Sequence, residues 1–260
     1  MLKQKVENFN TITDSIADDA SNLINYSKMD DVQRRIDLAT AYRAIAHLGA
    51  DDLTYTHLSV RSKSGNSLFI YPFGQLFSET TADSLLEVDF DGNIITGSEY
   101  QYNSTGYVIH GNLYKARPDL NAIFHLHTPE IVAVSSHKEG LMPISQWALH
   151  FYGGVAYHQY DSLALDSDQG SDLASDFGNK FTMLLRHHGS ITAGRSIYEA
   201  MFYTYHLIQA CKAQVAALSM GSESIIRIPE SICEKSNRDL LSFEKNLGLR
   251  DWKAFKRIVG

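Results

Sequence analysis

Ala-Ile-Phe-His-Leu-His-Thr occupies residues 122–128 of this 260-residue chain. The run predicts a strand, and successive side chains of a strand point to opposite faces. His125 and His127, two residues apart, therefore point the same way. Two imidazoles on one face are half of a metal site, and a pair of hydrogen-bonded core histidines is the alternative.

A second histidine pair, His187 and His188, closes another strand-like run at residues 181–186, directly before Gly189. A neighbouring strand that ends here can supply a third ligand. Because adjacent residues of a strand face opposite ways, only one of the two histidines joins the cluster. Three histidines leave coordination positions open, which is typical of a catalytic rather than a structural metal.

The composition is that of a globular protein, with 44% hydrophobic and 20% charged residues, and the length fits one large domain or two small ones. The formal net charge is -7. Lysine and arginine form only short pairs such as Arg34-Arg35, which argues against nucleic-acid binding and favours a small-molecule partner.

Two cysteines, Cys211 and Cys233, stand outside any Cys-x-x-Cys spacing, so neither a disulfide framework nor a thiolate metal site is predicted. The first residues are polar and acidic and lack the apolar run of a secretory signal. No stretch approaches the roughly eighteen apolar residues of a membrane span. We therefore expect a soluble cytoplasmic protein with no membrane partner.

Apolar residues at helical spacing and cap residues predict four helices, at residues 31–48, 107–115, 129–136 and 197–220. Asp30 and Thr128 are the expected N-caps of the first and third helices, and Ser196 with Glu199 forms a capping box for the fourth. A further amphipathic helix is predicted near residues 239–247.

Short β-like runs between turn signals predict strands at residues 57–61, 67–71, 86–90, 155–158 and 181–186. With no internal repeat or low-complexity linker, one compact α/β domain over residues 31–221 is expected. Residues 1–30 form a polar N-terminal extension in this interpretation. Residues 222–260 form a C-terminal extension that packs on the same domain.

Five motifs follow one another along the chain: Thr56-His57-Leu58-Ser59-Val60-Arg61, Pro72-Phe73-Gly74, Arg117-Pro118-Asp119, His125-Leu126-His127 and Arg186-His187-His188-Gly189. In this order they resemble the class II aldolase/adducin family over roughly residues 31–221. The segments at residues 151–153, 156–158 and 184–189 are most similar to its adducin-like branch.

The resemblance implies a three-layer α/β/α sandwich with a central, largely antiparallel sheet. It also implies a divalent metal, usually zinc, with Fe2+, Mn2+ or Co2+ as alternatives, and a homotetramer whose active sites lie at the subunit interfaces. The family's two His-x-His ligands fall on His125 and His127. The third ligand, which precedes the glycine, falls on His188, and His187 occupies a variable position.

The sequence departs from the aldolases at their acid/base glutamate, which aligns with Gly106. The family's phosphate-binding positions are only partly kept: Gly74, Ser104 and Thr105 match, whereas His57 replaces an asparagine and Phe73 a threonine. We take His57, Gly74, Ser104 and Thr105 as substrate-binding candidates and do not expect a phosphorylated substrate. A structural turn role for His57 is the alternative.

A metal held by three neutral imidazoles keeps its positive charge and stabilises an oxyanion that develops on a substrate carbonyl. Retro-aldol cleavage also needs a base, worth about 100-fold to 10,000-fold in rate, which Gly106 cannot supply. Decarboxylation of a 3-keto acid leaves CO2 and an enolate and needs only a later proton donor. The sequence therefore favours decarboxylation over aldol cleavage.

Tyr107, His110, Glu79 or a tyrosine of a neighbouring subunit are the candidates to replace the lost glutamate, and a helix-surface role is the alternative for His110. The predicted function is a metal-dependent carbon–carbon lyase acting on a small keto or hydroxy carbon acid or sugar derivative. Two other functions compete with it. One is an adducin-like oligomeric interaction module without catalysis, and the other is an iron-dependent oxygenase-like variant of the fold.

Overall fold

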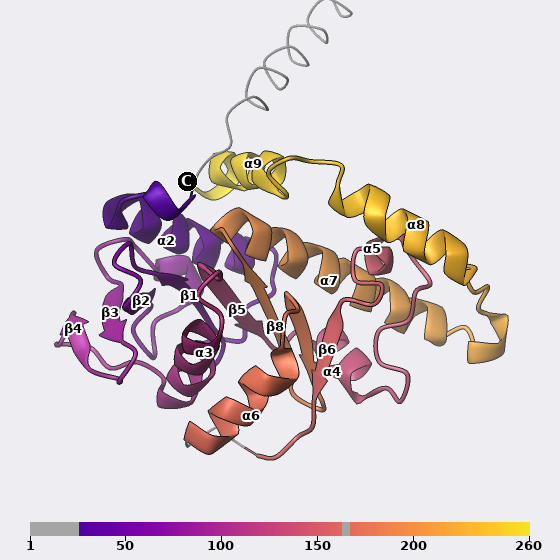
Figure 1. Ribbon diagram of the computed structural model, residues 1–260, viewed down its shortest axis with the longest axis horizontal. Helices are drawn as coiled ribbons and strands as arrows, with labels where there is room; N and C mark the ends of the chain where they lie inside the picture. Colours follow the sequence, from indigo (N-terminus) through magenta and orange to yellow (C-terminus); the bar gives the residue numbers. More distant parts are fainter. Residues whose placement is uncertain (1–25, 163–166) are drawn as a thin grey trace, which may run out of the picture.

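The computed structural model describes residues 26–162 and 167–260. Its centre is an eight-stranded sheet in the order β4-β3-β2-β1-β5-β8-β7-β6 (Figure 1). All neighbouring strands are antiparallel except β6 and β7, which are parallel. The strands are β1 His57–Arg61, β2 Ser67–Ile70, β3 Leu86–Asp89, β4 Ile94–Thr96, β5 Ala122–Leu126, β6 Val155–His158, β7 Thr182–Leu185 and β8 Gly189–Gly194.

Helices cover both faces of this sheet (Figure 1). On one face lie α2 (Asp31–His47) and α7 (Ile197–Leu218), and on the other lie α3 (Ser104–Ala116) and α6 (Ser167–Phe177). The other helical segments of the described residues are η1 Tyr26–Lys28, η2 Phe77–Glu79, α4 Pro129–Ser136, α5 Gln146–Leu149, η3 Ser222–Ser224, α8 Glu230–Leu241 and α9 Leu249–Val259. The predicted three-layer sandwich with a largely antiparallel sheet is confirmed.

The strand β5 lies between β1 and β8 and is buried along its whole length, as is β1. On one edge of β5, His125 pairs with His57 of β1. On its other edge, Leu126 pairs with Ser190 of β8. Because β7 and β8 form a hairpin, the turn between them lies beside the end of β5. This topology brings together segments that are more than sixty residues apart in the sequence.

The predicted helix caps are present at two of three positions. Asp30 Oδ1 accepts a hydrogen bond from the amide of Gln33 at 2.8 Å, and Ser196 Oγ accepts one from the amide of Glu199 at 3.1 Å. Thr128 precedes α4, but its hydroxyl makes no cap bond. Pro129 at the first position of α4 instead favours the helix start through its fixed φ.

The predicted amphipathic helix at residues 239–247 is wrong. The helix α8 ends at Leu241, and α9 begins at Leu249 after a turn that contains Gly248. Gly248 has a φ of +83°, and a Cβ on it would lie 2.4 Å from the carbonyl oxygen of Tyr198. The chain turns here against α7, so residues 242–248 of the predicted helix form the connection between α8 and α9.

Both ends of the described part of the chain contact the rest of the domain. Residues 1–25 of the predicted N-terminal extension lie outside the described residues, but the buried Arg34 donates to the carbonyl of Tyr26 at 2.8 Å. At the other end, α8 contacts α5, and α9 contacts α2 and α7. The domain boundaries at residues 31 and 221 stay predictions. None of the described helices combines the length and hydropathy that a membrane crossing requires.

Tyr42 of α2 connects the helical layer to two strands. Its buried hydroxyl accepts from the amides of Leu58 at 3.0 Å and of Tyr71 at 3.3 Å.

We expect Tyr42→Phe to lower the free energy of unfolding by about 1–3 kcal/mol, because the buried amides of Leu58 and Tyr71 would lose their hydrogen-bond acceptor. Urea unfolding followed by circular dichroism measures this loss. Tyr55→Phe, at a side chain that is 60% exposed, is the control, and equal losses in both variants would contradict the interpretation.

Candidate metal centre

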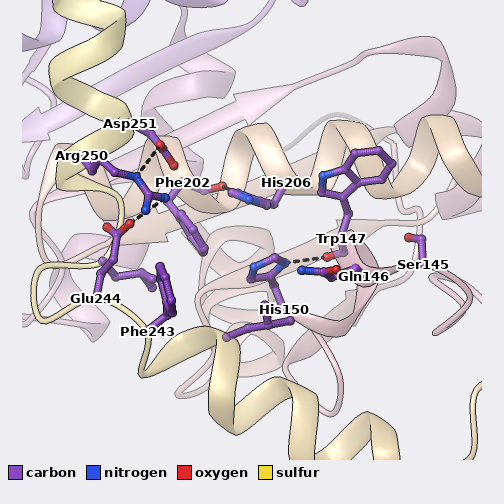
Figure 2. A pocket seen from close by; sticks show the side chains of 12 residues that line it. Ser145, Gln146, Trp147, His150, Phe202, His206, Phe243, Glu244, Arg250 and Asp251 are labelled. Atoms are coloured by element: carbon purple, nitrogen blue, oxygen red, sulfur yellow. Dashed lines mark hydrogen bonds and ion pairs between the residues drawn. The ribbon is translucent and has the colours of Figure 1, made fainter. Parts of the chain in front are cut away.

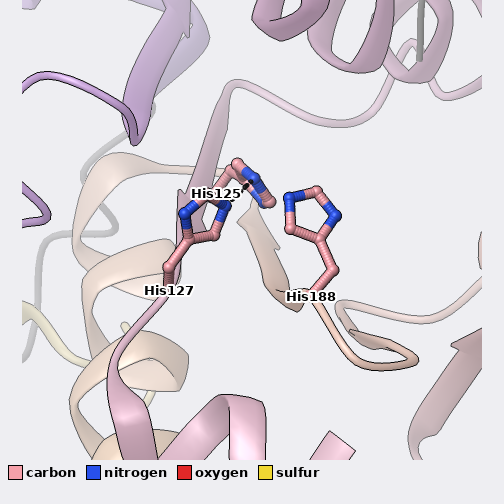
Figure 3. A group of neighbouring side chains, drawn as sticks. All are labelled: His125, His127 and His188. Atoms are coloured by element: carbon pink, nitrogen blue, oxygen red, sulfur yellow. Dashed lines mark hydrogen bonds between the residues drawn. The ribbon is translucent and has the colours of Figure 1, made fainter. Parts of the chain in front are cut away.

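Three histidines converge at the end of β5 (Figure 3). His125 is in β5, His127 follows it, and His188 lies in the turn between β7 and β8. One nitrogen from each ring lies within 4.8 Å of the others. The ring centroids are 4.5 Å apart for His125 and His127, 4.9 Å for His125 and His188, and 4.6 Å for His127 and His188.

His187 does not join this group. Residues 186–188 form a hairpin turn rather than the end of a strand, and His187 has a left-handed φ of +62°. Its exposed ring is directed to the Ser136 hydroxyl, with Nδ1 and Oγ 3.2 Å apart. The prediction that only one of the two histidines lies in the cluster agrees with this placement, although turn geometry and not strand alternation separates the rings.

Gly189 permits the close approach of the hairpin to β5. A Cβ on this residue would lie 2.4 Å from the carbonyl oxygen of Leu126 and 2.9 Å from Cδ2 of His127. Any larger residue must therefore push β8 away from β5 or displace the His127 ring. The glycine sets the distance between His188 and the other two histidines.

Two of the three imidazoles present a bare Nε2 to the centre of the group. The Nδ1 of His125 lies 3.0 Å from the carbonyl oxygen of Ser190, and the Nδ1 of His127 lies 3.1 Å from Oδ2 of Asp52. Both partners only accept, so both Nδ1 atoms carry the proton. The two Nε2 atoms are then acceptors only 2.7 Å apart, a spacing that requires a proton or a cation near them. This donor set fits a divalent metal.

Burial keeps the imidazoles uncharged. Burial lowers the pKa of His125, and the neighbouring histidines lower it further. Burial also lowers the pKa of His127, partly offset by the Asp52 carboxylate, and burial with the charge of His127 lowers that of His188 to about 4. Neutral imidazole is the form that ligates a metal.

The side chain of His57 occupies the space that a residue larger than glycine at position 106 would need. Its ring stacks on that of His125, with centroids 4.8 Å apart. A Cβ on Gly106 would lie 2.6 Å from both Nε2 and Cδ2 of His57. The space beside Gly106 is therefore filled by an imidazole that comes from β1.

A chain of hydrogen bonds leads from His57 into the core. Its Nδ1 lies 2.7 Å from Nε2 of His110, whose Nδ1 is bonded to the hydroxyl of Ser59. The Ser59 hydroxyl lies 3.0 Å from the hydroxyl of Tyr114. The buried His110 is thus engaged at both nitrogens and holds His57 in place.

The other predicted catalytic residues lie elsewhere on the fold. Tyr107 packs against Tyr102, with ring centroids 5.5 Å apart, on the side of α3 that faces Gly92. The exposed carboxylate of Glu79 accepts from the amide of Leu76 at 2.9 Å. Neither residue makes a hydrogen bond or ring contact with the clustered histidines in the described part of the chain.

The predicted substrate-binding residues other than His57 surround the start of α3. Gly74 has a φ of +92° in an exposed loop, and the preceding Phe73 amide donates to the carbonyl of Gln101 at 2.7 Å. Ser104 is the exposed first residue of α3. The hydroxyl of Thr105 is bonded to the Asn103 side chain at 2.7 Å.

Sequence reasoning missed the partners that orient the rings. Asp52 lies in the loop before β1, and Ser190 contributes only its carbonyl. Neither Asp52 nor Ser190 stands at a sequence distance from the histidines that would predict a contact with them. The pair Asp51-Asp52 ahead of the 57–61 strand was the one available signal, and it is weak because exposed acidic pairs are common.

Solved structures of class II aldolases share this α/β sandwich fold. A structure of an aldolase II superfamily protein from Pseudomonas syringae matches with a TM-score of 0.83 and 39% identity, covering 88% of this chain and 93% of that one. An L-fuculose 1-phosphate aldolase from Glaciozyma antarctica matches with a TM-score of 0.79 and 25% identity, covering 92% of each chain.

The family model for the class II aldolase and adducin N-terminal domain matches residues 36–215, so the chain belongs to this family. Rattus norvegicus alpha-adducin is 39% identical in an alignment of 203 positions that covers 76% of this chain and 27% of that protein. The predicted resemblance, including its adducin-like character, is confirmed.

We expect Gly189→Ala to separate His188 from His125 and His127 and to weaken Zn2+ binding by at least about tenfold, because ligand geometry is lost. Calorimetric titration of the purified variant measures this. Gly154→Ala is the control: like Gly189, Gly154 has no left-handed φ, but a Cβ on it would make only an ordinary contact, 3.5 Å from the carbonyl oxygen of Phe151. Equal Zn2+ affinity in the two variants would show that the close approach at Gly189 does not determine the positions of the three histidines.

The buried His110 makes stability depend on pH. Burial lowers its pKa to about 3 from an unfolded value of 6.5. The unfolded chain therefore binds a proton that the folded chain excludes, so stability falls as the pH drops below 6.5 and levels off near 3. The contribution is about 1.4 kcal/mol per pH unit. Urea unfolding from pH 7 to 4 should show a shallower slope in His110→Gln, and an unchanged slope would refute this origin.

Proposed function

We propose that this protein is a metal-dependent lyase that acts on a small keto or hydroxy carbon acid or sugar derivative, with decarboxylation ahead of retro-aldol cleavage. One observation carries the proposal. Three neutral imidazoles converge, while the ring of His57 fills the space beside Gly106, the position at which the sequence resemblance expects the aldolase glutamate. This arrangement supports charge stabilisation by a metal and offers no carboxylate at position 106 for aldol chemistry.

The proposed ligands are His125, His127 and His188, with zinc as the first candidate and Fe2+, Mn2+ or Co2+ as alternatives. A divalent cation bound there supplies a Lewis acid that stabilises an oxyanion. Asp52 and the Ser190 carbonyl orient two of the rings through their Nδ1 protons. Partners of this kind fix the tautomer and raise the basicity of metal-ligating histidines.

His57 is proposed to contact the substrate directly. Its Nε2 has no hydrogen-bond partner among the described residues, while its Nδ1 is fixed by His110. A neutral imidazole can donate or accept a hydrogen bond, which suffices to orient a substrate carboxylate or carbonyl. Loss of CO2 from a 3-keto acid requires no group to remove a hydroxyl proton, so it suits this site better than aldol cleavage does.

The start of α3 supports an unphosphorylated substrate. Asn103 Oδ1 accepts from the amides of Thr105 at 3.1 Å and Gly106 at 3.4 Å, and from the Thr105 hydroxyl. These are the groups at a helix N-terminus that otherwise bind a phosphate. Their capping by the chain itself argues that no phosphate is needed there.

A homotetramer with active sites between subunits is also part of the proposal. Tyr55, which directly precedes the motif at residues 56–61, is 60% exposed, and Phe73, in the motif at residues 72–74, is 48% exposed. Large exposed aromatic side chains beside a site are typical of surfaces that a second subunit covers. The cytoplasmic location stays a prediction.

The second candidate is an adducin-like interaction module without catalysis. The similarity to alpha-adducin and the glycine at position 106 favour it. The Nε2 atoms of His125 and His127 argue against it, because two lone pairs held 2.7 Å apart repel each other unless a proton or a cation lies near them. Metal content and turnover distinguish the two candidates.

Adjacent histidines in one turn provide a matched test. Purified protein should contain about one divalent metal per chain, which His188→Gln should lose and His187→Gln should keep. With a panel of 3-keto acids and aldol adducts, we expect metal-dependent CO2 release that falls with the metal content of the two variants.

Other outcomes would identify the alternatives. Aldol cleavage without CO2 would make the protein an aldolase with a new base, and turnover only in the presence of oxygen would make it an oxygenase. A folded, metal-free protein without turnover would support the interaction module.

A further inference from the structure

His158 of β6 lies on the same face of the sheet as the histidine cluster. His125 of β5 pairs with Ile191 of β8, which also pairs with Met183 of β7. Met183 in turn pairs with Ala156 of β6. Residues that pair directly across neighbouring strands point to one face, and so do residues two apart in a strand. His158, two residues after Ala156, therefore points to the face on which His125 lies.

The end of β6 lies beside the turn that carries His188. The strands β5, β6 and β7 run in the same direction, so they end at the same edge of the sheet. His158 pairs with Leu185 at the end of β7, and its carbonyl accepts from the amide of Arg186 at 2.9 Å. His158 and His188 line one small cavity of about 30 Å3, together with Ile109 of α3. That volume holds one water molecule or one small substrate group.

Asp176 of α6 orients the ring of His158. Nδ1 of His158 lies 2.7 Å from Oδ2 of Asp176, and because an ionised carboxylate only accepts, Nδ1 carries a proton. Nε2 makes no hydrogen bond with a residue of the described ranges, and Oδ1 of Asp161 lies 3.9 Å from it. Asp161 also lines the cavity, so Nε2 lies on the cavity side of the ring. In the imidazolium form this atom carries the second proton.

The proposed decarboxylation requires a proton donor, because loss of CO2 leaves an enolate carbon. Tyr107 packs on Tyr102, and His110 is engaged at both nitrogens. The strand order places His57 of β1 and His158 of β6 on opposite sides of β5. His57 can therefore orient the substrate from one side of the cluster while His158 faces it from the other.

We propose that His158, held by Asp176, is the catalytic acid that protonates the enolate carbon after CO2 leaves, a role that rests on the proposed function. The carbon–carbon bond breaks, and its electron pair stays on the substrate as the enolate. The Nε2–H bond of the imidazolium then breaks and a C–H bond forms. The neutral imidazole regains a proton from water, because the His158 side chain is 13% exposed. Histidine with a carboxylate partner is suited to such a transfer.

The stereochemistry of the product distinguishes a proton donor from a structural residue. A 3-keto acid with two different substituents on C2 yields a ketone with a new stereocentre. We expect the unaltered protein to form one enantiomer, because His158 delivers the proton from one side. His158→Gln should keep its metal, release CO2 about 100-fold more slowly and form both enantiomers equally, because water then protonates the enolate. Elemental analysis, CO2 release and chiral chromatography measure these three properties.

His150→Gln is the control for the loss of a histidine. The buried His150 lines a separate cavity of about 550 Å3 where α5 and α7 meet the C-terminal segment. Figure 2 shows His150 there, with Glu244 and Arg250 on the other side of the cavity. The two cavities share no lining residue. This variant should release CO2 at the unaltered rate and form one enantiomer.

A chemical label checks the position of His158 without turnover. Bromopyruvate, a small keto acid with a leaving group, should alkylate Nε2 of neutral His158, so that a carbon–nitrogen bond forms and bromide leaves. Both cysteines are buried and compete little for the label. Peptide mass spectrometry should find the label on His158, and an excess of acetoacetate should suppress it.

The possible outcomes separate this role from the proposed function. No CO2 release by the unaltered protein would overturn the proposed function and this role with it. CO2 release with a racemic product, a single enantiomer from His158→Gln, or absence of the label from His158 would overturn the role of His158 alone.

Discussion

The pairing of β5 with β1 on one edge and β8 on the other is the constraint on which the candidate site depends. It places His57 beside His125 and lays the β7–β8 turn against His127. A shift of one residue in this register would turn His125 and His127 to the opposite face of the sheet. Burial on both faces opposes such a shift, because it would move apolar side chains of β5 into the wrong layer.

The same chemical arrangement orients two rings of the histidine cluster. A backbone carbonyl holds the proton on Nδ1 of His125, a carboxylate holds that on Nδ1 of His127, and burial keeps both rings uncharged. Their Nε2 lone pairs then lie 2.7 Å apart and repel each other unless a proton or a cation lies near them. The fold therefore favours a cation at this position before any metal binds.

Much of this could be predicted from local signals. Alternation along β5 predicted that His125 and His127 share a face, and caps at Asp30 and Ser196 predicted the starts of α2 and α7. What depends on tertiary contacts could not be predicted. Asp52 reaches His127 only because the loop before β1 passes the end of β5, and the C-terminal helices were misplaced because the Gly248 turn is defined by its contact with α7.

The contact between His57 and Gly106 has a consequence for how the site can change. Acquiring a glutamate at position 106 in one step would drive its Cβ into the His57 ring, 2.6 Å away, and the ring is held by His110 and stacked on His125. Shrinking residue 57 first would open a void beside His125. Each single step is therefore disfavoured, and the two residues can be exchanged only as a pair. Steric epistasis between positions 57 and 106 therefore disfavours every single substitution that would change this arrangement during evolution.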